Sequence, residues 1–336
     1  MPSIIITGAN GFVGSHILEA FTSQQPVKVI AACRDPSKLP SWFSGETLVG
    51  DLRDPAYIKS IAEAADVICH AAAWTSLWNH ARASHDLFLE PSLQLVRAAA
   101  AAGVSRFVFI STTSAAAPQT SHDPLSRGIP RRFWPHLCNV IAIENAMRDY
   151  AAKTTMVTLR CGIFAGERYG LGVLPILLPR LKTHLVPWIN RGRTSLPIVD
   201  GSDIGQAFVR AALAPGLTGY TAFNIVGPEV PSTREVIQFI HDEFGYPQPH
   251  FSVPFPIAYA FAWLMEKLDA VVPWEPLVTR SIVHLLEEVN ASNQEATKRL
   301  GYQAQVHWKT AIRKQLAEMK LKQKTGMKMF RPLPDA

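Results

Sequence analysis

Short apolar runs alternate with longer helical stretches along the first half of the chain. The runs are rich in β-branched residues and are bounded by turn residues, which is typical of buried strands. The predicted strands are Pro2–Thr7, Val27–Cys33, Asp66–His70, Phe107–Ile110 and Thr155–Arg160. The predicted helices are Phe12–Phe21, one opened by Asp54-Pro55 that runs through Ala64, an alanine-rich one that ends at Gly103, and Ile141–Ala152. This alternation indicates βαβ units, and therefore an α/β fold whose parallel sheet is covered on both faces.

The pattern changes after about Gly166, because prolines cluster and loops break the helices. We expect a smaller, mostly helical lobe here, with one return to the sheet near Tyr220–Val226. The predicted organisation is a doubly wound sheet domain over 1–165, completed by part of 195–228, then a substrate-binding lobe over 166–318 and a basic tail over 319–336. The apolar run Pro254–Met265 is too short to cross a bilayer. We expect it to form a buried helix or the wall of a pocket in preference to a membrane contact.

Composition narrows the possible function classes. The chain has 336 residues, of which 48% are apolar and 18% charged, so it can bury a sizeable core. Its four cysteines lie far apart with no CxxC pair. We therefore expect neither a disulfide framework nor a metal site, and a reducing, cytoplasmic compartment. Because the first predicted strand begins almost at once, we expect no signal peptide.

The net charge of +6 is concentrated at the C-terminal end. Residues 307–336 hold eight Lys/Arg against Glu318 and Asp335, so the rest of the chain is electrically balanced. No basic face with interleaved aromatic residues is evident in that balanced part, and we expect no nucleic-acid partner. A basic tail can contact anionic lipid, but we interpret this one as a solvated, frayed end.

The strongest functional signal is the segment GANGFVG, which lies between the first predicted strand and the first predicted helix. Gly8 permits a tight turn, Gly11 lets backbone amides approach a pyrophosphate, and Gly14 lets the helix pack closely on the strand. The helix N-terminus adds partial positive charge. The motif predicts a Rossmann-type dinucleotide site made by Gly8, Asn10, Gly11, Phe12, Val13 and Gly14.

The GxxGxxG spacing resembles the short-chain dehydrogenase/reductase superfamily. Segments 198–204 (IVDGSDI) and 300–302 (LGY) are similar to marks of its extended subfamily, which includes sugar epimerases, dehydratases and 3β-hydroxysteroid dehydrogenases. The resemblance implies that the acidic-apolar pair Asp51 and Leu52 flanks the adenine. It implies that the small-residue segment Ala71, Ala72 and Ala73 passes the ribose and phosphates. It also implies that Cys161 stands beside the nicotinamide in place of the usual proline. It also implies that Thr112 takes the family's catalytic Ser/Thr position.

The end of the second predicted strand bears on the choice of dinucleotide. A carboxylate there would bind the adenosine ribose 2′-hydroxyl and repel a 2′-phosphate. The chain instead has Cys33 near that place, followed by Arg34, with Lys38 close by. A guanidinium can hold a phosphate through two parallel hydrogen bonds, so we expect NADP(H) in preference to NAD(H). In the alternative interpretation, Arg34 only pairs with Asp35 at the surface.

The proton-transfer pair typical of this superfamily is absent from its expected place. The resemblance implies a tyrosine and a lysine four residues apart on one helix face, with a glutamate four residues after the lysine. If Glu144 is that glutamate, Val140 stands at the lysine position and His136 at the tyrosine position. Tyr150 and Lys153 are three residues apart and lie too far along the same helix, so we exclude them.

Two interpretations of His136 stay open. In the first, its imidazole replaces the tyrosine as general acid and base, because a free histidine pKa of about 6.5 suits proton transfer at neutral pH. Thr112 then orients the substrate oxygen. In the second, the site no longer relays protons and His136 is a tolerated polar residue on a loop or a first helical turn. The candidate catalytic residues are therefore Thr112 and His136.

Aromatic residues gather around this part of the sequence. Trp74 and Trp78 follow the small-residue segment, and Phe133 lies further along the chain. Such rings can belong to a core or to a substrate wall, but two tryptophans beside the cleft favour an apolar or aromatic substrate over a sugar nucleotide. Arg193 either binds an anionic or carbonyl group of the substrate or is a solvated charge. The predicted substrate-binding residues are Trp74, Trp78, Phe133 and Arg193.

These observations favour an atypical NADP(H)-dependent reductase that acts on a bulky, apolar or aromatic carbonyl or alcohol. One alternative is a redox-neutral isomerase, cyclase or dehydratase that reuses the same pocket. Another is a dinucleotide-binding subunit or sensor without catalytic activity, because it would keep the glycine loop and lose the catalytic pair. We expect a small-molecule substrate, and the resemblance allows a homodimer that pairs through helices.

Overall fold

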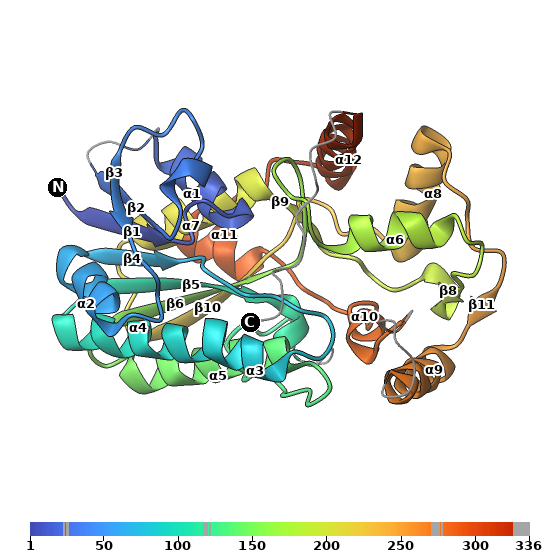
Figure 1. Ribbon diagram of the computed structural model, residues 1–336, viewed down its shortest axis with the longest axis horizontal. Helices are drawn as coiled ribbons and strands as arrows, with labels where there is room; N and C mark the ends of the chain where they lie inside the picture. The colour runs from blue at the N-terminus through green and yellow to red at the C-terminus, as the bar shows by residue number, and fades with distance from the viewer. Residues whose placement is uncertain are drawn as a thin grey trace.

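Seven parallel strands form the central sheet of the computed structural model (Figure 1), which describes residues 1–22, 24, 27–116, 120, 122–269, 276 and 278–324. The strands follow one another across the sheet in the order β10-β6-β5-β4-β1-β2-β3. They are β1 Ser3–Thr7, β2 Lys28–Cys33, β3 Glu46–Val49, β4 Val67–His70, β5 Arg106–Thr112, β6 Thr155–Cys161 and β10 Tyr220–Ile225. The predicted Rossmann-type fold is confirmed, and β10 is the return of the chain to the sheet.

β1 lies inside the sheet because its residues are apolar on both faces. Ile4, Ile5 and Ile6 are fully buried, and β1 pairs with β2 on one side and with β4 on the other. The strand order therefore reverses between β1 and β4. In sheets of this type, ligands bind outside the carboxyl ends of the strands at such a reversal, which is where the glycine segment follows β1.

Two apolar cores cover the two faces of the sheet. One face carries α1 (Phe12–Thr22), α7 (Gly201–Leu213) and α11 (Gln294–Leu300). The other carries α2 (Pro55–Ala64), α4 (Glu90–Ala102) and α5 (Pro135–Tyr150), with α3 (Ala81–Ser84) and a π-helical turn (His85–Leu89) leading into α4. Burial on both faces explains the nearly continuous apolar runs of the strands.

Local capping sets where several helices begin. Asp54 caps α2 by accepting a 2.9 Å hydrogen bond from the backbone amide of Ala56. α5 begins at Pro135, earlier than the predicted start at Ile141. Proline fits this first turn because its missing N–H would have no helical partner there. The longer α5 places His136 in its first turn.

The second part of the chain forms a smaller lobe, at the right of Figure 1. It contains two pairs of short parallel strands, β7 with β9 and β8 with β11. Its elements are β7 Ile163–Ala165, β8 Trp188–Ile189, β9 Ile198–Asp200, β11 Ser252–Val253, α6 Val173–Leu181, α8 Thr233–Phe244, α9 Phe255–Leu268, α10 Arg280–His284 and α12 Trp308–Lys324. A third apolar core joins α6, α8 and α12. The boundary expected between 318 and 319 falls inside α12, and residues 325–336 lie outside the described ones.

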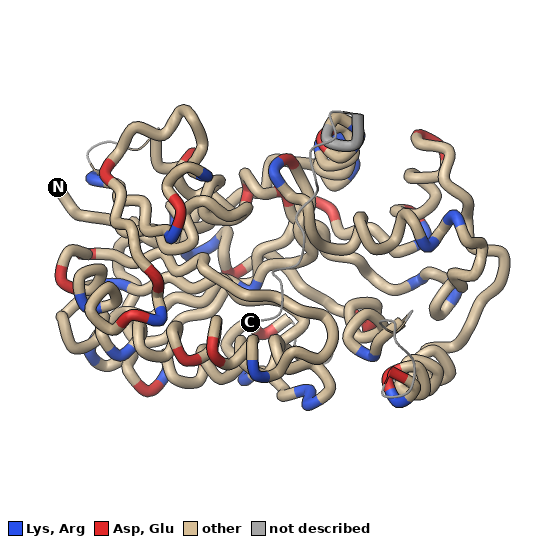
Figure 2. The backbone as a smooth tube through the Cα atoms, in the orientation of Figure 1, with Lys and Arg blue, Asp and Glu red and all other residues tan. Residues whose placement is uncertain are grey.

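The apolar run predicted to be a buried helix or the wall of a pocket does line a cavity, through Phe255, Pro256 and Tyr259, but it is not a fully buried helix. It forms α9, but the buried side chains of this helix are only Ala258, Ala262 and Glu266. Its exposed apolar side chains lie on the side that faces away from β8, β11 and α10, the elements against which α9 packs. Among the described residues, every helix is too short or too polar to cross a membrane. Basic and acidic positions are interspersed over both lobes in Figure 2.

Candidate active site

The glycine segment forms a tight turn pressed against the chain that follows β4. Gly8 has a φ of +67°, and a Cβ on it would lie 2.6 Å from the Cα of Ala72. A Cβ on Gly14 would lie 2.1 Å from the carbonyl oxygen of Gly8. The turn is closed by a 2.9 Å hydrogen bond from the amide of Gly11 to that same carbonyl. Only glycine fits these places, as a turn that admits a pyrophosphate to the N-terminus of α1 requires.

The adenosine end of the predicted cofactor site lies at the carboxyl ends of β2 and β3. Asn10 donates a 3.0 Å hydrogen bond to the carbonyl oxygen of Asp35 and so ties the glycine turn to the end of β2. Arg53 binds the Asp51 carboxylate through Nε at 3.1 Å and Nη2 at 2.8 Å. The hydrogen bonds from Arg53 hold the pKa of Asp51 below its usual range. Asp51 is therefore ionised, and Arg53 already binds its carboxylate.

Arg34 is the cation with freedom to bind a ligand at this end. Its side chain is 60% exposed, and its closest acidic partner is Asp51 at 3.9 Å. Asp35 does not pair with Arg34, because it accepts from Ser37 and lies 3.1 Å from Lys38. Arg34 therefore does not form the surface pair with Asp35 that the alternative interpretation required, and its contact with Asp51 is long and exposed.

β5 ends in two hydroxyl residues with different surroundings. Ser111 is buried and donates a 2.5 Å hydrogen bond to Glu144, which is itself bound by Arg160. Thr112 is partly exposed, and its Oγ1 accepts a 3.2 Å hydrogen bond from the amide of Ser114. The hydroxyl proton of Thr112 is therefore available to a substrate oxygen, whereas that of Ser111 is not. Cys161 lies beside Thr112 on β6 and is fully buried.

His136 lies in the first turn of α5 and has one buried ring nitrogen without a partner. Its Nδ1 makes no hydrogen bond with the described residues, and its ring is 5.1 Å from that of Phe88. Burial lowers the pKa of His136 to about 4, although a hydrogen bond with the backbone of Trp74 acts in the opposite direction. The imidazole is therefore neutral at pH 7, and Nδ1 can accept a hydrogen bond from a ligand or water.

The predicted aromatic residues form the link between the sheet domain and the lobe. Trp78 donates a 2.9 Å hydrogen bond from Nε1 to Asp269 just after α9. Phe133 packs edge-on against Tyr259 of α9 at 5.8 Å, and Arg280 of α10 lies 4.8 Å from its ring centre. Trp74 is half-buried against the core that contains α4 and α5. Trp78 and Phe133 therefore join the sheet domain to the lobe, whereas Trp74 packs within the sheet domain.

Arg193 lies apart from the other predicted substrate residues. It follows the turn Asn190–Gly192 in the lobe and is exposed. Within the described ranges, its side chain has no recorded contact with the aromatic residues or with His136. Arg193 is therefore not assembled with them, and its role in substrate binding stays a prediction.

A cluster that the sequence did not indicate lies at the junction of α10 with the end of β5. His284 faces the carbonyl oxygen of Ser114 through Nε2 at 3.1 Å and the Glu287 carboxylate through Nδ1. Arg131 lies 3.6 Å from Glu287. Both ring nitrogens of His284 therefore face oxygen atoms. The hydrogen bond from His284 lowers the pKa of Glu287.

This cluster lines a cavity of about 350 Å³ between the loop before α5 and the lobe. Its walls are Arg131, Phe133, Phe255, Pro256, Tyr259, His284 and Glu287. The cluster has no sequence motif, since His284 lies far from Thr112 in the chain and only the tertiary fold brings α10 to β5. The mixture of aromatic walls and a few charged groups is typical of small-molecule sites.

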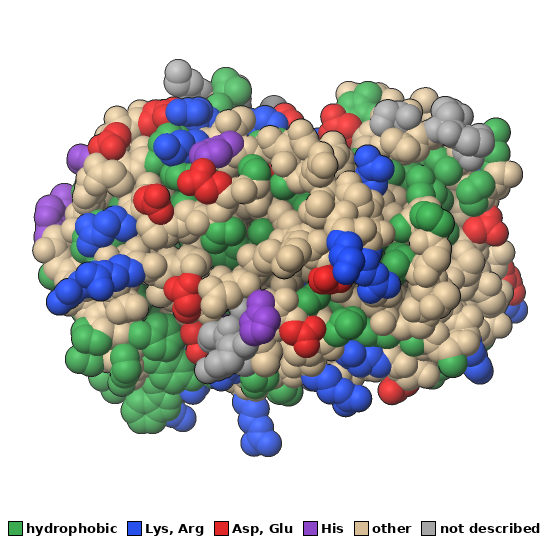
Figure 3. Space-filling view, turned by 180° about the vertical axis from the view of Figure 1, so that it is seen from behind, with side chains coloured by type: hydrophobic (Ala, Val, Ile, Leu, Met, Phe, Trp, Pro, Cys, Tyr) green, Lys and Arg blue, Asp and Glu red, His purple; other side chains and the backbone are tan. Residues whose placement is uncertain are grey.

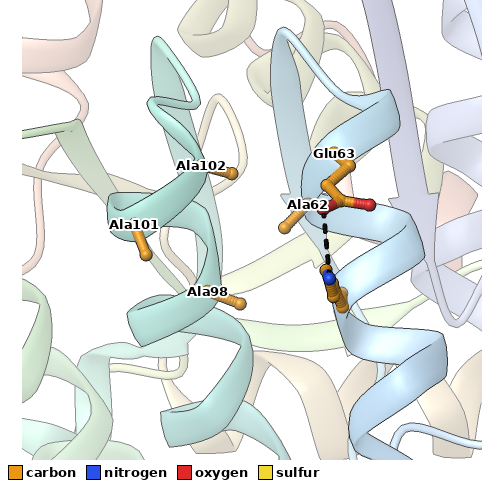
Figure 4. A pocket seen from close by; sticks show the side chains of 6 residues that line it. Ala62, Glu63, Ala98, Ala101 and Ala102 are labelled. Carbon is orange, nitrogen blue, oxygen red and sulfur yellow. Dashed lines mark ion pairs between the residues drawn. The ribbon is translucent and has the colours of Figure 1, made fainter.

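A larger hollow, of about 570 Å³, lies between α2 and α4 (Figure 4). It is lined mostly by alanines, together with the exposed pair Lys59 and Glu63. These residues belong to the C-terminal ends of the two helices, which lie at the opposite edge of the sheet from the carboxyl ends of the strands. The hollow is therefore separate from the glycine turn, from the end of β5 and from the His284 cluster. Among the described residues, no three His, Cys, Asp or Glu side chains converge as a metal site would require.

Three curated proteins are similar to this chain over nearly its full length. The first is the decarboxylating sterol-4-alpha-carboxylate 3-dehydrogenase of Dictyostelium discoideum, 22% identical, covering 92% of this chain and 98% of its own. The second is the 4-hydroxy-2-methyl-3-oxo-4-farnesyl-3,4-dihydroquinoline-1-oxide ketoreductase of Stigmatella aurantiaca, 25% identical, covering 90% and 92%. The third is the 2-alkyl-3-oxoalkanoate reductase of Stenotrophomonas maltophilia, 22% identical, covering 93% and 97%.

Solved structures share the fold at low sequence identity. The crystal structure of gox2253 matches with a TM-score of 0.75 at 20% identity, covering 97% of this chain and 99% of that one. MoeE5 in complex with UDP-glucuronic acid and NAD matches with a TM-score of 0.68 at 20% identity, covering 95% and 99%. These similarities support the fold of this chain, a sheet domain followed by a smaller lobe.

A family model described as the NAD dependent epimerase/dehydratase family matches residues 4–225. That span runs from β1 to the end of β10 and so contains the glycine turn, both hydroxyl residues of β5 and the whole sheet. The predicted resemblance to the extended short-chain dehydrogenases/reductases is confirmed, and with it an NAD(P)-dependent oxidoreductase that acts on a small molecule. The chain belongs to the NAD dependent epimerase/dehydratase family.

Proposed function

We propose that this protein is an NADP(H)-dependent reductase of a bulky, apolar or aromatic carbonyl compound. The observation that carries the proposal is His136, whose neutral imidazole has an unpartnered buried Nδ1 in the first turn of α5. Phe88 and the backbone of Trp74 adjoin it. An open ring nitrogen in apolar surroundings suits a substrate that offers one polar oxygen on an apolar body.

The residues present fit a dinucleotide. The glycine turn has room for a pyrophosphate only because side chains are absent there, and Arg34 is exposed where a 2′-phosphate would lie. When bound, the dinucleotide supplies or accepts a hydride. Thr112 orients the substrate oxygen by donating a hydrogen bond to it, and protonated His136 gives the one proton that this oxygen needs, directly or through a water. The aromatic rings exclude other water.

The relatives support the chemical class of the substrate. Their names describe a dehydrogenase, a ketoreductase and a reductase that act on a sterol carboxylate, a farnesyl-substituted 3-oxo compound and a 2-alkyl-3-oxoalkanoate. Each substrate named there has a large apolar part beside the reacting group. We infer the same combination for this chain.

The central test measures NADPH consumption with a panel of aromatic, enone and long-chain 3-oxo carbonyl compounds. We expect turnover for at least one bulky apolar member and little for small polar ketones. No consumption with any compound, although NADPH is bound, would contradict the proposal. Product formed without consumption of NADPH would instead support a redox-neutral isomerase, cyclase or dehydratase.

The rate of reduction should rise as the pH is lowered from about 8 to about 5.5, because proton donation needs protonated His136. The pKa of His136 lies at about 4, so the protonated fraction grows about tenfold for each pH unit across this range. His136→Gln should be slow and nearly independent of pH. His241→Gln, which changes an exposed histidine on α8, serves as the control and should keep the wild-type slope. A flat wild-type profile would exclude His136 as the donor.

Arg34→Asp should weaken NADPH binding by about 10- to 100-fold, the effect of one charge-assisted contact. NADH binding should change little, because NADH lacks the 2′-phosphate. Lys28→Ala is a matched control, since Lys28 is an exposed cation at the other end of the same strand. Titration of cofactor fluorescence measures both affinities, and an equal loss for NADH and NADPH would argue against a contact with the 2′-phosphate.

A further inference from the structure

α9 exposes a row of large apolar side chains. Five of its residues are between 42% and 59% exposed, and they are Ile257, Phe261, Trp263, Leu264 and Leu268. Four of these follow the spacing i, i+4, i+7, i+11, which places them in one stripe along the helix. Figure 3 shows a continuous apolar patch over this helix, at its lower left. Scattered exposed apolar residues are ordinary, but a row on one helix indicates a contact surface.

Charge is nearly absent from the exposed side of α9. Glu266 points the other way, into the lobe, where it accepts 2.6 Å hydrogen bonds from Nε and the backbone amide of Arg280. Lys267 is exposed, and its Nζ lies 6.0 Å from the ring centre of Trp263. A tryptophan beside a lysine at the margin of an apolar stripe is typical of a helix that lies at a lipid–water boundary.

We propose that α9 docks this protein on the surface of a lipid bilayer, with the helix axis in the membrane plane. The apolar stripe enters the region between headgroups and acyl chains, and Lys267 stays at the level of the headgroups. The helix is only fourteen residues long, so it lies on the membrane and does not cross it.

The shape and area of the patch favour lipid over a second copy of the chain. A single helix at the outer edge of the lobe forms a ridge (Figure 1). Five half-exposed large side chains offer on the order of 500 Å², whereas a stable dimer buries about 800 Å² on each partner. Lipid chains need no complementary shape, so a narrow ridge is sufficient for them.

Insertion of apolar side chains, and not attraction of charges, drives this contact. The basic residues near the C-terminus belong largely to α12, which lies at the opposite edge of the lobe from α9 (Figure 1). The exposed side of α9 itself offers Lys267 alone. Binding should therefore occur on zwitterionic lipid and depend little on salt, unlike binding through a basic patch.

α9 also walls the cavity beside the candidate active site. Phe255 and Tyr259 line the 350 Å³ cavity together with Phe133 and His284, and His284 contacts the segment after β5 through Ser114. A bilayer contact at α9 would therefore place this cavity next to the source of an apolar substrate. This consequence rests on the proposed function, whereas lipid binding itself does not.

The test measures flotation of the full chain with phosphatidylcholine vesicles at low and high salt. Wild-type protein should float with the vesicles under both conditions. The double variant Phe261→Ser with Leu264→Ser should bind about tenfold less, because two inserted side chains are lost. Leu125→Ser, which changes a residue of similar exposure (47%) on the sheet domain, should bind like wild type.

A second measurement locates the contact. Phosphatidylcholine brominated on its acyl chains should quench part of the tryptophan fluorescence, and Trp263→Phe should remove that part. Trp42→Phe changes a tryptophan of nearly equal exposure, 44% against 47%, and should keep the quenching. Absence of wild-type flotation would overturn the proposal. So would a wild-type dimer that the double variant converts to monomer without any vesicle binding, because α9 would then join two copies.

Discussion

Gly14→Ala should abolish dinucleotide binding and should have the largest functional effect of the single substitutions considered for this protein. The new Cβ would lie 2.1 Å from the carbonyl oxygen of Gly8 and 2.7 Å from the Cα of Ala9. Both neighbours are backbone atoms of the turn itself, so relief requires the turn to open or α1 to move away from β1. Either movement displaces the amides that would face the pyrophosphate.

We expect the affinity for NADPH to fall at least about 100-fold, comparable to the loss of several charge-assisted hydrogen bonds. Equilibrium titration followed by cofactor fluorescence measures it, and circular dichroism reports whether the fold survives. Gly170→Ala is the matched control, because a Cβ there meets nothing within 4 Å and the backbone needs no positive φ. Binding of NADPH to Gly14→Ala with wild-type affinity would refute the assignment of the turn.

Glu144→Ala should cause the largest loss of stability, about 3–5 kcal/mol in the free energy of unfolding. Glu144 and Arg160 are 1% and 0% exposed and lie 2.6 Å apart. Removal of the carboxylate leaves a buried guanidinium without its counter-ion. It also leaves the hydroxyl of Ser111 without the oxygen to which it donates.

Urea denaturation followed by circular dichroism measures the effect. Replacement of both charges, Glu144→Leu with Arg160→Met, should cost much less than Glu144→Ala alone, because no unpaired charge is then buried. Glu63→Ala, which breaks the exposed pair with Lys59, should change stability by less than about 1 kcal/mol. A similar small effect of Glu144→Ala would show that the buried pair does not stabilise the fold.

Burial around α5 disfavours a lysine at the position that the superfamily's usual couple would need. Val140, at the lysine position, is 3% exposed and packs in the core between α5 and the sheet. A lysine there would have to bury its ammonium group in apolar surroundings. Glu144, the residue that would follow that lysine, is instead committed to Arg160 and Ser111. These surroundings disfavour a lysine at position 140, and the absence of the tyrosine–lysine couple stays a prediction.

The predictions that succeeded depend on short-range patterns. The strand–glycine–helix succession around Gly8 and Gly14 requires one backbone geometry, and the alternation of elements admits a parallel sheet with few alternatives. The predicted strands agree with the structure to within one or two residues. Asp54 and Pro55 marked the start of α2 because capping and the first helical turn depend on neighbouring residues only.

Other properties depend on contacts between residues far apart in the chain. The sequence offered His136 as a candidate with an ordinary histidine pKa, but burial lowers that pKa to about 4. It held no sign of the His284 cluster, because α10 meets the end of β5 only after the lobe has folded back. The exposure of one side of α9 likewise depends on which elements pack against this helix, since apolar character alone does not specify burial.

The amino-acid sequence by itself therefore determined the sheet and the glycine turn, since local geometry and residue identity are sufficient for these. Tertiary structure alone decided the burial of the His136 ring nitrogen, the assembly of the cavity around His284 and the exposure of α9. The physical reason is that desolvation, electrostatics and accessibility are properties of the surroundings that folding creates.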